Sequence, residues 1–138
     1  DNATARELAL LSGLWGYRVV EASLLNTPTL GLRAHRLMEQ AKALDPDDPF
    51  VLLIEGQSLL FRPALFGGDA NAALSRFRLL LTRLAQVPDA AISEMEANLW
   101  IWYTLDRMNL ADAADALKAD LLAADPPPLY RQFLLDPP

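Results

Sequence analysis

The 138-residue chain is 52% hydrophobic and carries 12 basic against 18 acidic residues, for a net charge of −6. A chain of this length forms one domain that buries roughly two thirds of the surface its unfolded form exposes. The scattered basic residues exclude nucleic acid as an expected partner, and the absence of cysteine excludes disulfides and thiolate metal sites. No apolar run reaches the roughly 18 to 20 residues of a membrane span, so we expect no membrane-spanning helix.

Ten prolines divide the chain into segments of helical length, because proline removes a backbone donor and disfavours helix at the preceding residue. The segments are rich in Ala, Leu, Arg and Glu, and no stretch alternates with period two, so the predicted fold class is all-α. Six helices are expected: Thr4–Leu25, Thr29–Leu44, Pro49–Phe61, Asp69–Ala85, Asp89–Arg107 and Leu110–Ala124. The fourth shows the clearest apolar stripe, at Ala73, Phe77, Leu80 and Leu84.

Short acidic residues stand just before three of these helices. They are Asp47 or Asp48, Asp69, and Asp89. A carboxylate at this position accepts hydrogen bonds from the first free N–H groups of the helix. We therefore expect all three helices to be capped by aspartate.

The stretch "RPALFGGDANAAL" joins the third and fourth predicted helices. Pro63 ends one helix, Gly67 and Gly68 supply the positive φ angles of a tight reversal, and Asp69 caps the next helix. A phosphate loop would need a lysine and a hydroxyl residue after the glycines. Asn71 and Ala72 stand there instead. The stretch is predicted to be a turn with a cap rather than an anion site.

Related sequences end successive helix pairs: "AHRLMEQAKALDPDDP", "ALSRFRLLLTRLAQVP" and "ADALKADLLAADP". The first carries small or apolar residues and a proline at steps of four, three and five, at Ala34, Met38, Ala41 and Pro46. This spacing resembles the second half of a tetratricopeptide repeat (TPR), in which small residues let two helices approach and proline ends the unit. Gly16 and Gly56 stand at the small-residue position of the leading helices.

The TPR resemblance implies three stacked helical pairs, 4–44, 48–86 and 89–124, that form a short right-handed superhelix. A stack of three units leaves an apolar end face, which the tail 125–138 is expected to cap. The candidates for this packing are Leu129, Tyr130, Phe133 and Leu134.

The "P-x-x-F-G-G-D" insertion and the "LDPDDP" linker resemble a group of bacterial, often exported TPR-like proteins. This implies a non-catalytic protein-interaction or scaffold module. The alternative is a small-molecule-binding accessory subunit of a periplasmic transport system, because the insertion also resembles helical subunits beside some tripartite transporters. An enclosed aromatic pocket would favour the transport subunit, and an open groove the interaction module. A periplasmic or otherwise exported location is expected, with the cytoplasm as the alternative.

The chain lacks the residue sets of known catalytic and metal sites. His35 is the only histidine, and the acidic "DPDDP" stretch is too short for a calcium loop. Glu94 and Glu96 are two residues apart and point to different faces of a helix, which argues against joint acid–base work. We therefore expect no enzymatic activity, no metal and no cofactor.

In TPR arrays the leading helices line a concave groove that binds ligands. The resemblance places Tyr17, Glu21, Gln57 and either Trp102 or Tyr103 on this groove. Consecutive helical residues point about 100° apart, so at least one aromatic residue of "LWIWY" should face away from the core. Because the chain is acidic, we expect a neutral or basic protein or peptide partner, bound mainly through apolar burial. The sequence predicts no oligomeric state.

Overall fold

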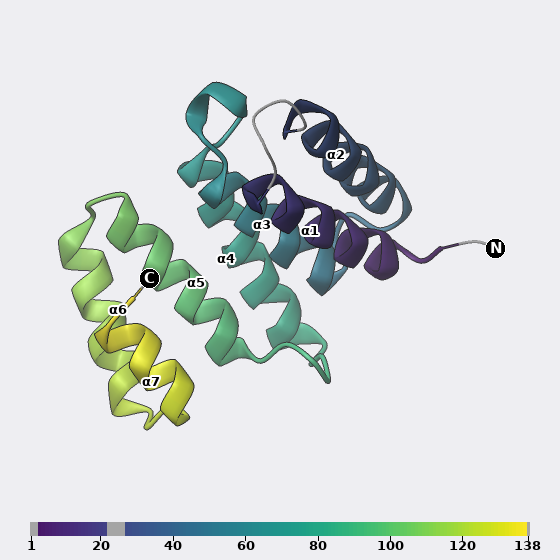
Figure 1. Cartoon of the computed structure of the whole chain (residues 1–138). Coiled ribbons are helices and arrows are strands. Elements are labelled where there is room, and N and C mark those ends of the chain that lie inside the picture. The colour runs from purple at the N-terminus through teal and green to yellow at the C-terminus, as the bar shows by residue number, and fades with distance from the viewer. Residues whose placement is uncertain (1–2, 22–26, 138) are drawn as a thin grey trace.

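The computed structural model describes residues 3–21 and 27–137, with residues 17–21 and 27 described without their side chains. Every regular element in these residues is helical, so the all-α prediction is confirmed (Figure 1). The elements are α1 (Ala5–Glu21), α2 (Thr27–Leu44), α3 (Pro49–Phe61), the 3-10 turn η1 (Ala64–Phe66), α4 (Ala70–Gln86), α5 (Glu94–Arg107), α6 (Ala111–Ala123) and α7 (Pro128–Leu135). The expected number of six was wrong, because the proline-rich tail forms α7.

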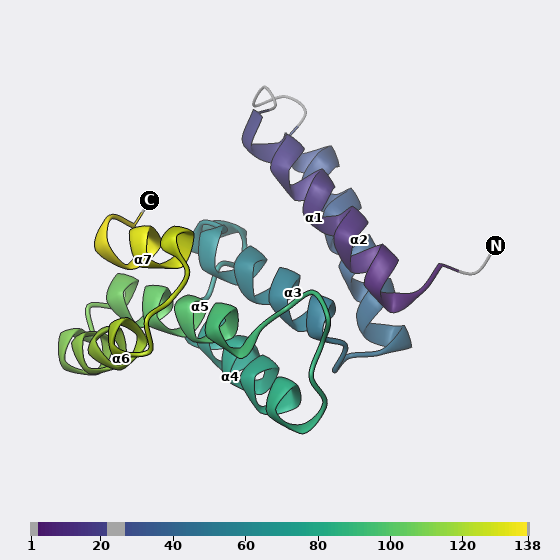
Figure 2. The same cartoon turned by 90° about the horizontal axis from the view of Figure 1, so that it is seen from below.

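The helices pack mainly against their neighbours in sequence. α1 packs against α2, α3 against α4, and α5 against α6. Between these pairs, α1 also contacts α3, and α4 contacts α5. Figures 1 and 2 show α1 and α2 at one side of the molecule and α6 and α7 at the other. The helices α3, α4 and α5 lie between them and join the two sides.

Two of the expected aspartate caps begin helices in the structure. The Asp48 carboxylate accepts hydrogen bonds from the N–H groups of Phe50 at 2.9 Å and Val51 at 3.3 Å. The Asp69 carboxylate accepts one from the N–H of Ala72 at 3.1 Å. Each therefore satisfies free donors in the first turn of α3 or α4, and these caps are confirmed.

The expected Asp89 cap is wrong, because α5 begins later in the chain. Ser93 caps α5 instead, and its hydroxyl accepts a hydrogen bond from the Glu96 N–H at 3.1 Å. The Asp89 carboxylate accepts from the Ala91 N–H at 2.8 Å and binds the guanidinium of Arg6. Asp89 thus shapes the loop before α5 rather than its first turn.

The start of α1 carries a cap that the sequence analysis missed. The Thr4 hydroxyl accepts a hydrogen bond from the Glu7 N–H at 3.2 Å, and the Glu7 carboxylate accepts one from the Thr4 N–H at 2.8 Å. This reciprocal pair is a capping box. The Thr-x-x-Glu spacing of "TARE" is the signal that could have predicted it.

The two glycines of the insertion act differently from each other. Gly67 has a φ of 91°, as predicted, whereas Gly68 has no positive φ. A Cβ at Gly68 would lie 1.7 Å from the carbonyl oxygen of Arg62, so this position requires glycine for space. The Asp69 N–H then donates to the Leu59 carbonyl at 2.9 Å, which folds the insertion back onto the last turn of α3.

The larger hydrophobic core connects α3, α4, α5, α6 and α7. The stripe predicted on α4 is confirmed, since all four of its members are buried: Ala73, Phe77, Leu80 and Leu84. A Cβ at Gly56 would lie only 2.5 Å from the Phe77 ring, so the absence of a side chain lets α3 and α4 approach. Leu134 of α7 is also fully buried in this core.

A smaller core connects α1, α2 and the start of α3. Its buried members are mostly small: Ala5, Ala9, Met38, Ala41 and Val51. Leu8 and Ile54 pack against it and are partly buried. Small residues bring helices close together but remove less apolar surface from water than large ones.

Candidate binding surface

The structure contradicts the prediction that either Trp102 or Tyr103 faces an open groove. Both side chains are only 3% exposed. The reason is α7, whose Phe133 ring lies 5.9 Å from the Trp102 ring and 5.4 Å from the Tyr103 ring. Phe61 of α3 packs against Tyr103 as well, at 6.0 Å. Neither residue is therefore available on the surface to bind a partner.

These residues belong to an aromatic cluster centred on Trp100 of α5. The Trp100 ring is stacked on Phe77 at 5.8 Å and makes edge contacts with Phe61 at 5.9 Å and Phe133 at 5.8 Å. Its contacts therefore join four helices, α3, α4, α5 and α7. Edge and offset arrangements of this kind add to the stabilisation from burial alone. The cluster is a packing feature of the fold.

Two polar contacts lie beside this cluster, one near the start of α5 and one at its end. Burial raises the pKa of Glu96, and a hydrogen bond between its carboxylate and the Trp100 side chain opposes this rise. At the other end, the Arg107 guanidinium donates to the Tyr103 hydroxyl at 3.2 Å. It also lies 5.6 Å from the Tyr103 ring. These contacts satisfy polar groups of aromatic residues and bring no acid and base together.

The remaining predicted groove residues are Tyr17, Glu21 and Gln57. The side chains of Tyr17 and Glu21 lie outside the part of the chain that the structure describes at that level. Gln57 lies on α3 and is partly exposed. Of the five predicted residues, Gln57 is thus the one that the structure places at an accessible position.

The contacts of α1 show which of its sides is open. A Cβ at Gly13 would lie 3.4 Å from Ile54, so this side of α1 faces α3. The Ser12 hydroxyl donates to the Ala34 carbonyl of α2 at 2.7 Å, so α2 lies in the direction of Ser12. One side of α1 lies next to its contact with α3 and points away from α2. Neither α2 nor α3 covers this side.

Two leucines occupy this open side of α1. At 100° per residue, Leu10 and Leu14 lie about 60° and 100° from Gly13, in the direction opposite to Ser12. Both are exposed, Leu14 to 63%. Large apolar side chains are thus held in solvent directly beside the contact between α1 and α3.

The neighbouring side of α3 is open in the same direction. Glu55 marks the side of α3 toward α2, because its carboxylate lies 3.3 Å from the Lys42 ammonium group. Gln57 lies about 60° from Ile54 in the opposite direction, away from α2. We call the surface formed by these open sides the α1–α3 face, with the members Leu10, Leu14, Ile54 and Gln57.

The α1–α3 face is mainly apolar. Three of its members are aliphatic, and the amide of Gln57 supplies one donor and acceptor group. The sequence analysis missed Leu10 and Leu14, although "LALLSGLWGY" carries apolar residues around the whole helix. A helix with more apolar residues than one stripe can bury is the signal that points to such a face.

The most strongly connected charges lie at Arg6. Its guanidinium contacts Asp89 at 2.6 Å and Asp48 at 3.3 Å, and lies 4.5 Å from the centre of the Phe50 ring. The Ala91 N–H and the Arg6 guanidinium hold the pKa of Asp89 below its ordinary value. The Arg6 guanidinium pairs with both carboxylates, and each carboxylate also accepts backbone N–H groups. This arrangement ties α1 to the start of α3 and to the loop before α5.

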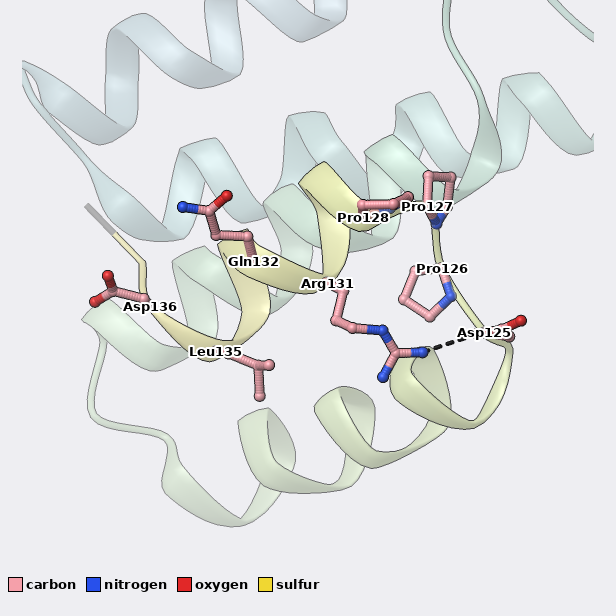
Figure 3. Close-up of a pocket in the computed structure, with 8 residues that line it drawn as sticks. All are labelled: Asp125, Pro126, Pro127, Pro128, Arg131, Gln132, Leu135 and Asp136. Carbon is pink, nitrogen blue, oxygen red and sulfur yellow. Dashed lines mark hydrogen bonds and ion pairs between the residues drawn. The ribbon is translucent and has the colours of Figure 1, made fainter.

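An open depression of about 690 Å³ lies between α6 and α7. Figure 3 shows Arg131 and Leu135 directed from α7 toward α6, with Pro126 and Asp125 at one end. The Arg131 guanidinium already contacts the Asp125 carboxylate at 2.8 Å. Gln132, Asp136 and two further prolines complete the lining. No aromatic side chain contributes to this depression, and its cation is already paired.

Comparison of the chain with protein-family models, with curated proteins and with solved structures finds no match. The TPR resemblance therefore stays a prediction from sequence motifs. Among the described helices, none has both the length and the hydrophobicity needed to cross a bilayer. The described His, Asp and Glu side chains form no group of three or more that could hold a metal ion.

Proposed function

We propose that this chain is a non-catalytic protein-interaction or scaffold module that binds its partner through the α1–α3 face. The observation that carries the proposal is the exposure of Leu10 and Leu14 beside the α1–α3 contact. Exposed apolar side chains gathered on one face are typical of interaction sites. An open apolar surface with a single amide favours a protein or peptide over a small molecule.

The proposal includes a TPR-like architecture of three stacked helical pairs in a right-handed superhelix. Two observations support it: the pairwise packing of α1 with α2, α3 with α4, and α5 with α6, and the close approach of Phe77 to Gly56. In such an array α1, α3 and α5 are the leading helices, and α7 covers the α5 part of their surface. A periplasmic or otherwise exported location is part of the same proposal and rests on the sequence resemblance.

The partner segment for this face is neutral or basic and binds through apolar side chains. The face itself carries no charge, and the chain as a whole carries −6, which repels acidic segments at a distance. An accessory subunit that binds a small molecule would need an enclosed pocket. The depression between α6 and α7 is open and lacks aromatic lining, so it does not support that alternative.

Site-specific crosslinking tests the proposal, because a chain without cysteine accepts one label at one chosen position. Leu14→Cys and Gln57→Cys are labelled with a photoreactive maleimide and irradiated in an extract of cells that express the protein. Arg78→Cys, on the exposed surface of α4, is the matched control. The proposal expects one shared protein adduct from positions 14 and 57 that position 78 does not give. Equal adducts at all three positions, or none at 14 and 57, would overturn it.

A further inference from the structure

The insertion between α3 and α4 exposes a second group of large apolar side chains. Leu65 is 88% exposed and Phe66 is 68% exposed, both on the η1 turn. Phe61, at the end of α3, is 50% exposed, and its other side packs against Trp100. We call Phe61, Leu65 and Phe66 the insertion surface.

The backbone that carries these side chains is held in one conformation by hydrogen bonds and by the two glycines. The N–H groups of Phe66 and Gly68 both donate to the Pro63 carbonyl, at 2.9 and 3.0 Å. Gly67 adopts a left-handed φ, and Gly68 lies against the Arg62 carbonyl. A fixed backbone loses little conformational entropy on binding, so apolar side chains presented in this way are prepared for contact with a partner.

Two guanidinium groups border the insertion surface. Arg107 lies 5.7 Å from the centre of the Phe61 ring, and Arg62 directly follows Phe61 in the chain. Neither forms an ion pair with any residue that the structure describes; Arg62 donates to the Ser58 hydroxyl, and Arg107 to the Tyr103 hydroxyl. Both cations therefore remain available to a carboxylate from outside.

Asp69 and Asp106 carry the nearby carboxylates, and neither is placed to neutralise the two arginines. Asp69 is engaged at the start of α4, where it accepts from the Ala72 N–H. Asp106 is exposed, but lies about 100° around α5 from Arg107. The border of Phe61 itself is thus cationic, within a chain whose net charge is −6.

We propose that the insertion surface docks a peptide segment of another protein that combines aliphatic or aromatic side chains with Asp or Glu. The apolar side chains cover Leu65 and Phe66, while a carboxylate pairs with Arg107 beside Phe61. This occupant has the opposite charge from the one proposed for the α1–α3 face. The two surfaces can therefore be tested, and can fail, separately.

The distribution of charge also argues against two other partners for the insertion surface, a second copy of this chain and an anionic membrane. A two-fold contact between copies of this chain through the insertion surface would bring like guanidinium groups together, which is unfavourable. An anionic membrane would attract these two arginines, but would repel the net charge of the whole chain. A short acidic and apolar segment pairs with the local cations and brings only a few negative charges close to the acidic chain.

The test uses a phage-displayed library of random short peptides, selected on the wild-type protein and counter-selected on the double variant Leu65→Ser/Phe66→Ser. Both positions are exposed, so the variant should keep the wild-type melting temperature. Leu129→Ser, at an exposed leucine on α7, is the matched control. Selected peptides are then synthesised, and their dissociation constants are measured by fluorescence anisotropy.

The proposal expects selected peptides to be enriched in apolar residues together with Asp or Glu. Their affinity should fall at least about tenfold in the double variant and in Arg107→Gln, and stay unchanged in Leu129→Ser. The proposal would be overturned if the selected peptides were basic, or if none of them required Leu65 and Phe66 for binding. A wild-type dimer that the double variant dissociates, or binding to phosphatidylglycerol vesicles that the double variant abolishes, would also overturn it. The α1–α3 face is intact in all of these variants.

Discussion

The two sides of the molecule are packed by different means. α1 and α2 meet α3 through alanines, one methionine and one valine, whereas α5 and α7 meet through Trp100, Trp102, Tyr103 and Phe133. Apolar burial stabilises by roughly 25 cal/mol per Å², so the aromatic side contributes more to the free energy of unfolding. Leucines are exposed on both sides, at Leu10 and Leu14 of α1 and at Leu129 and Leu135 of α7. The two sides therefore differ in the size of their buried side chains, while both carry exposed apolar residues.

The strongest test of this comparison is Leu134→Ala in α7. Leu134 is fully buried against α5 and α6, so the substitution should lower the free energy of unfolding by about 2 to 5 kcal/mol. Leu129→Ala, at an exposed position on the same helix, should change it by less than about 0.5 kcal/mol. Urea denaturation measures both. Equal effects would show that α7 is not part of the stable side.

Two glycines at the same expected repeat position sharpen the comparison. A Cβ at Gly56 would meet the Phe77 ring, while one at Gly16 has no atom within 4 Å. Gly56→Ala should therefore lower the free energy of unfolding by about 1 to 3 kcal/mol through overpacking. Gly16→Ala should raise it by up to about 1 kcal/mol through helix propensity. Thermal unfolding followed by circular dichroism would reveal the opposite signs, and equal signs would contradict the packing described.

The ion pair at Asp89 gives the α1 side a dependence on pH. Its folded pKa is lowered by the Ala91 N–H and by Arg6, so its stabilising contribution is complete above the unfolded pKa and is lost as pH falls through the folded value. Asp89→Asn should cost about 1 kcal/mol at neutral pH and less at about pH 3. Asp120→Asn, on the exposed side of α6, is the control. A constant effect of Asp89→Asn at both pH values would exclude this linkage.

The smallest expected effect is that of Glu96→Gln in α5. Burial raises the folded pKa of Glu96, so folding favours its protonated form, and stability falls as pH rises from the ordinary value through the folded one. Glutamine keeps an acceptor for Trp100 without the charge. The variant should raise the free energy of unfolding at neutral pH by up to about 0.5 kcal/mol. Glu94→Gln is the exposed control, and a clear loss of stability in Glu96→Gln would be the contrary result.

The elements of the fold were largely predictable from the sequence because their signals are local. Proline positions, the stripe on α4 and the caps at Asp48 and Asp69 each depend on residues a few positions apart. The cap predicted at Asp89 was wrong because α5 begins at Glu94, with Ser93 as its cap. The Asp89 carboxylate instead binds the Ala91 N–H and Arg6, which is 83 residues away in sequence. The space requirement of Gly68 comes from the path of the Arg62 carbonyl, which a sequence pattern does not contain.

The candidate surface was less predictable, because exposure depends on what covers each helix. Trp102 and Tyr103 lie on a helix that could have lined an open groove, but Phe133 of the tail packs on both. Leu10 and Leu14 have ordinary core residue types, and only the placement of α2 and α3 leaves them open. Leu65 and Phe66 are exposed because η1 turns them outward, although the sequence correctly indicated the turn itself.

The contact between Arg6 and Asp89 has a consequence for how the chain unfolds. In an array of stacked helical pairs each pair contacts only its neighbours, so the ends can open one after another. Arg6 lies on α1, yet it binds Asp89 in the loop that leads into α5. In the sequence, α3 and α4 lie between these two residues. Opening of α1 therefore removes a contact from the loop before α5. The Arg6–Asp89 contact thus links the opening of α1 to that of a loop far away in the sequence.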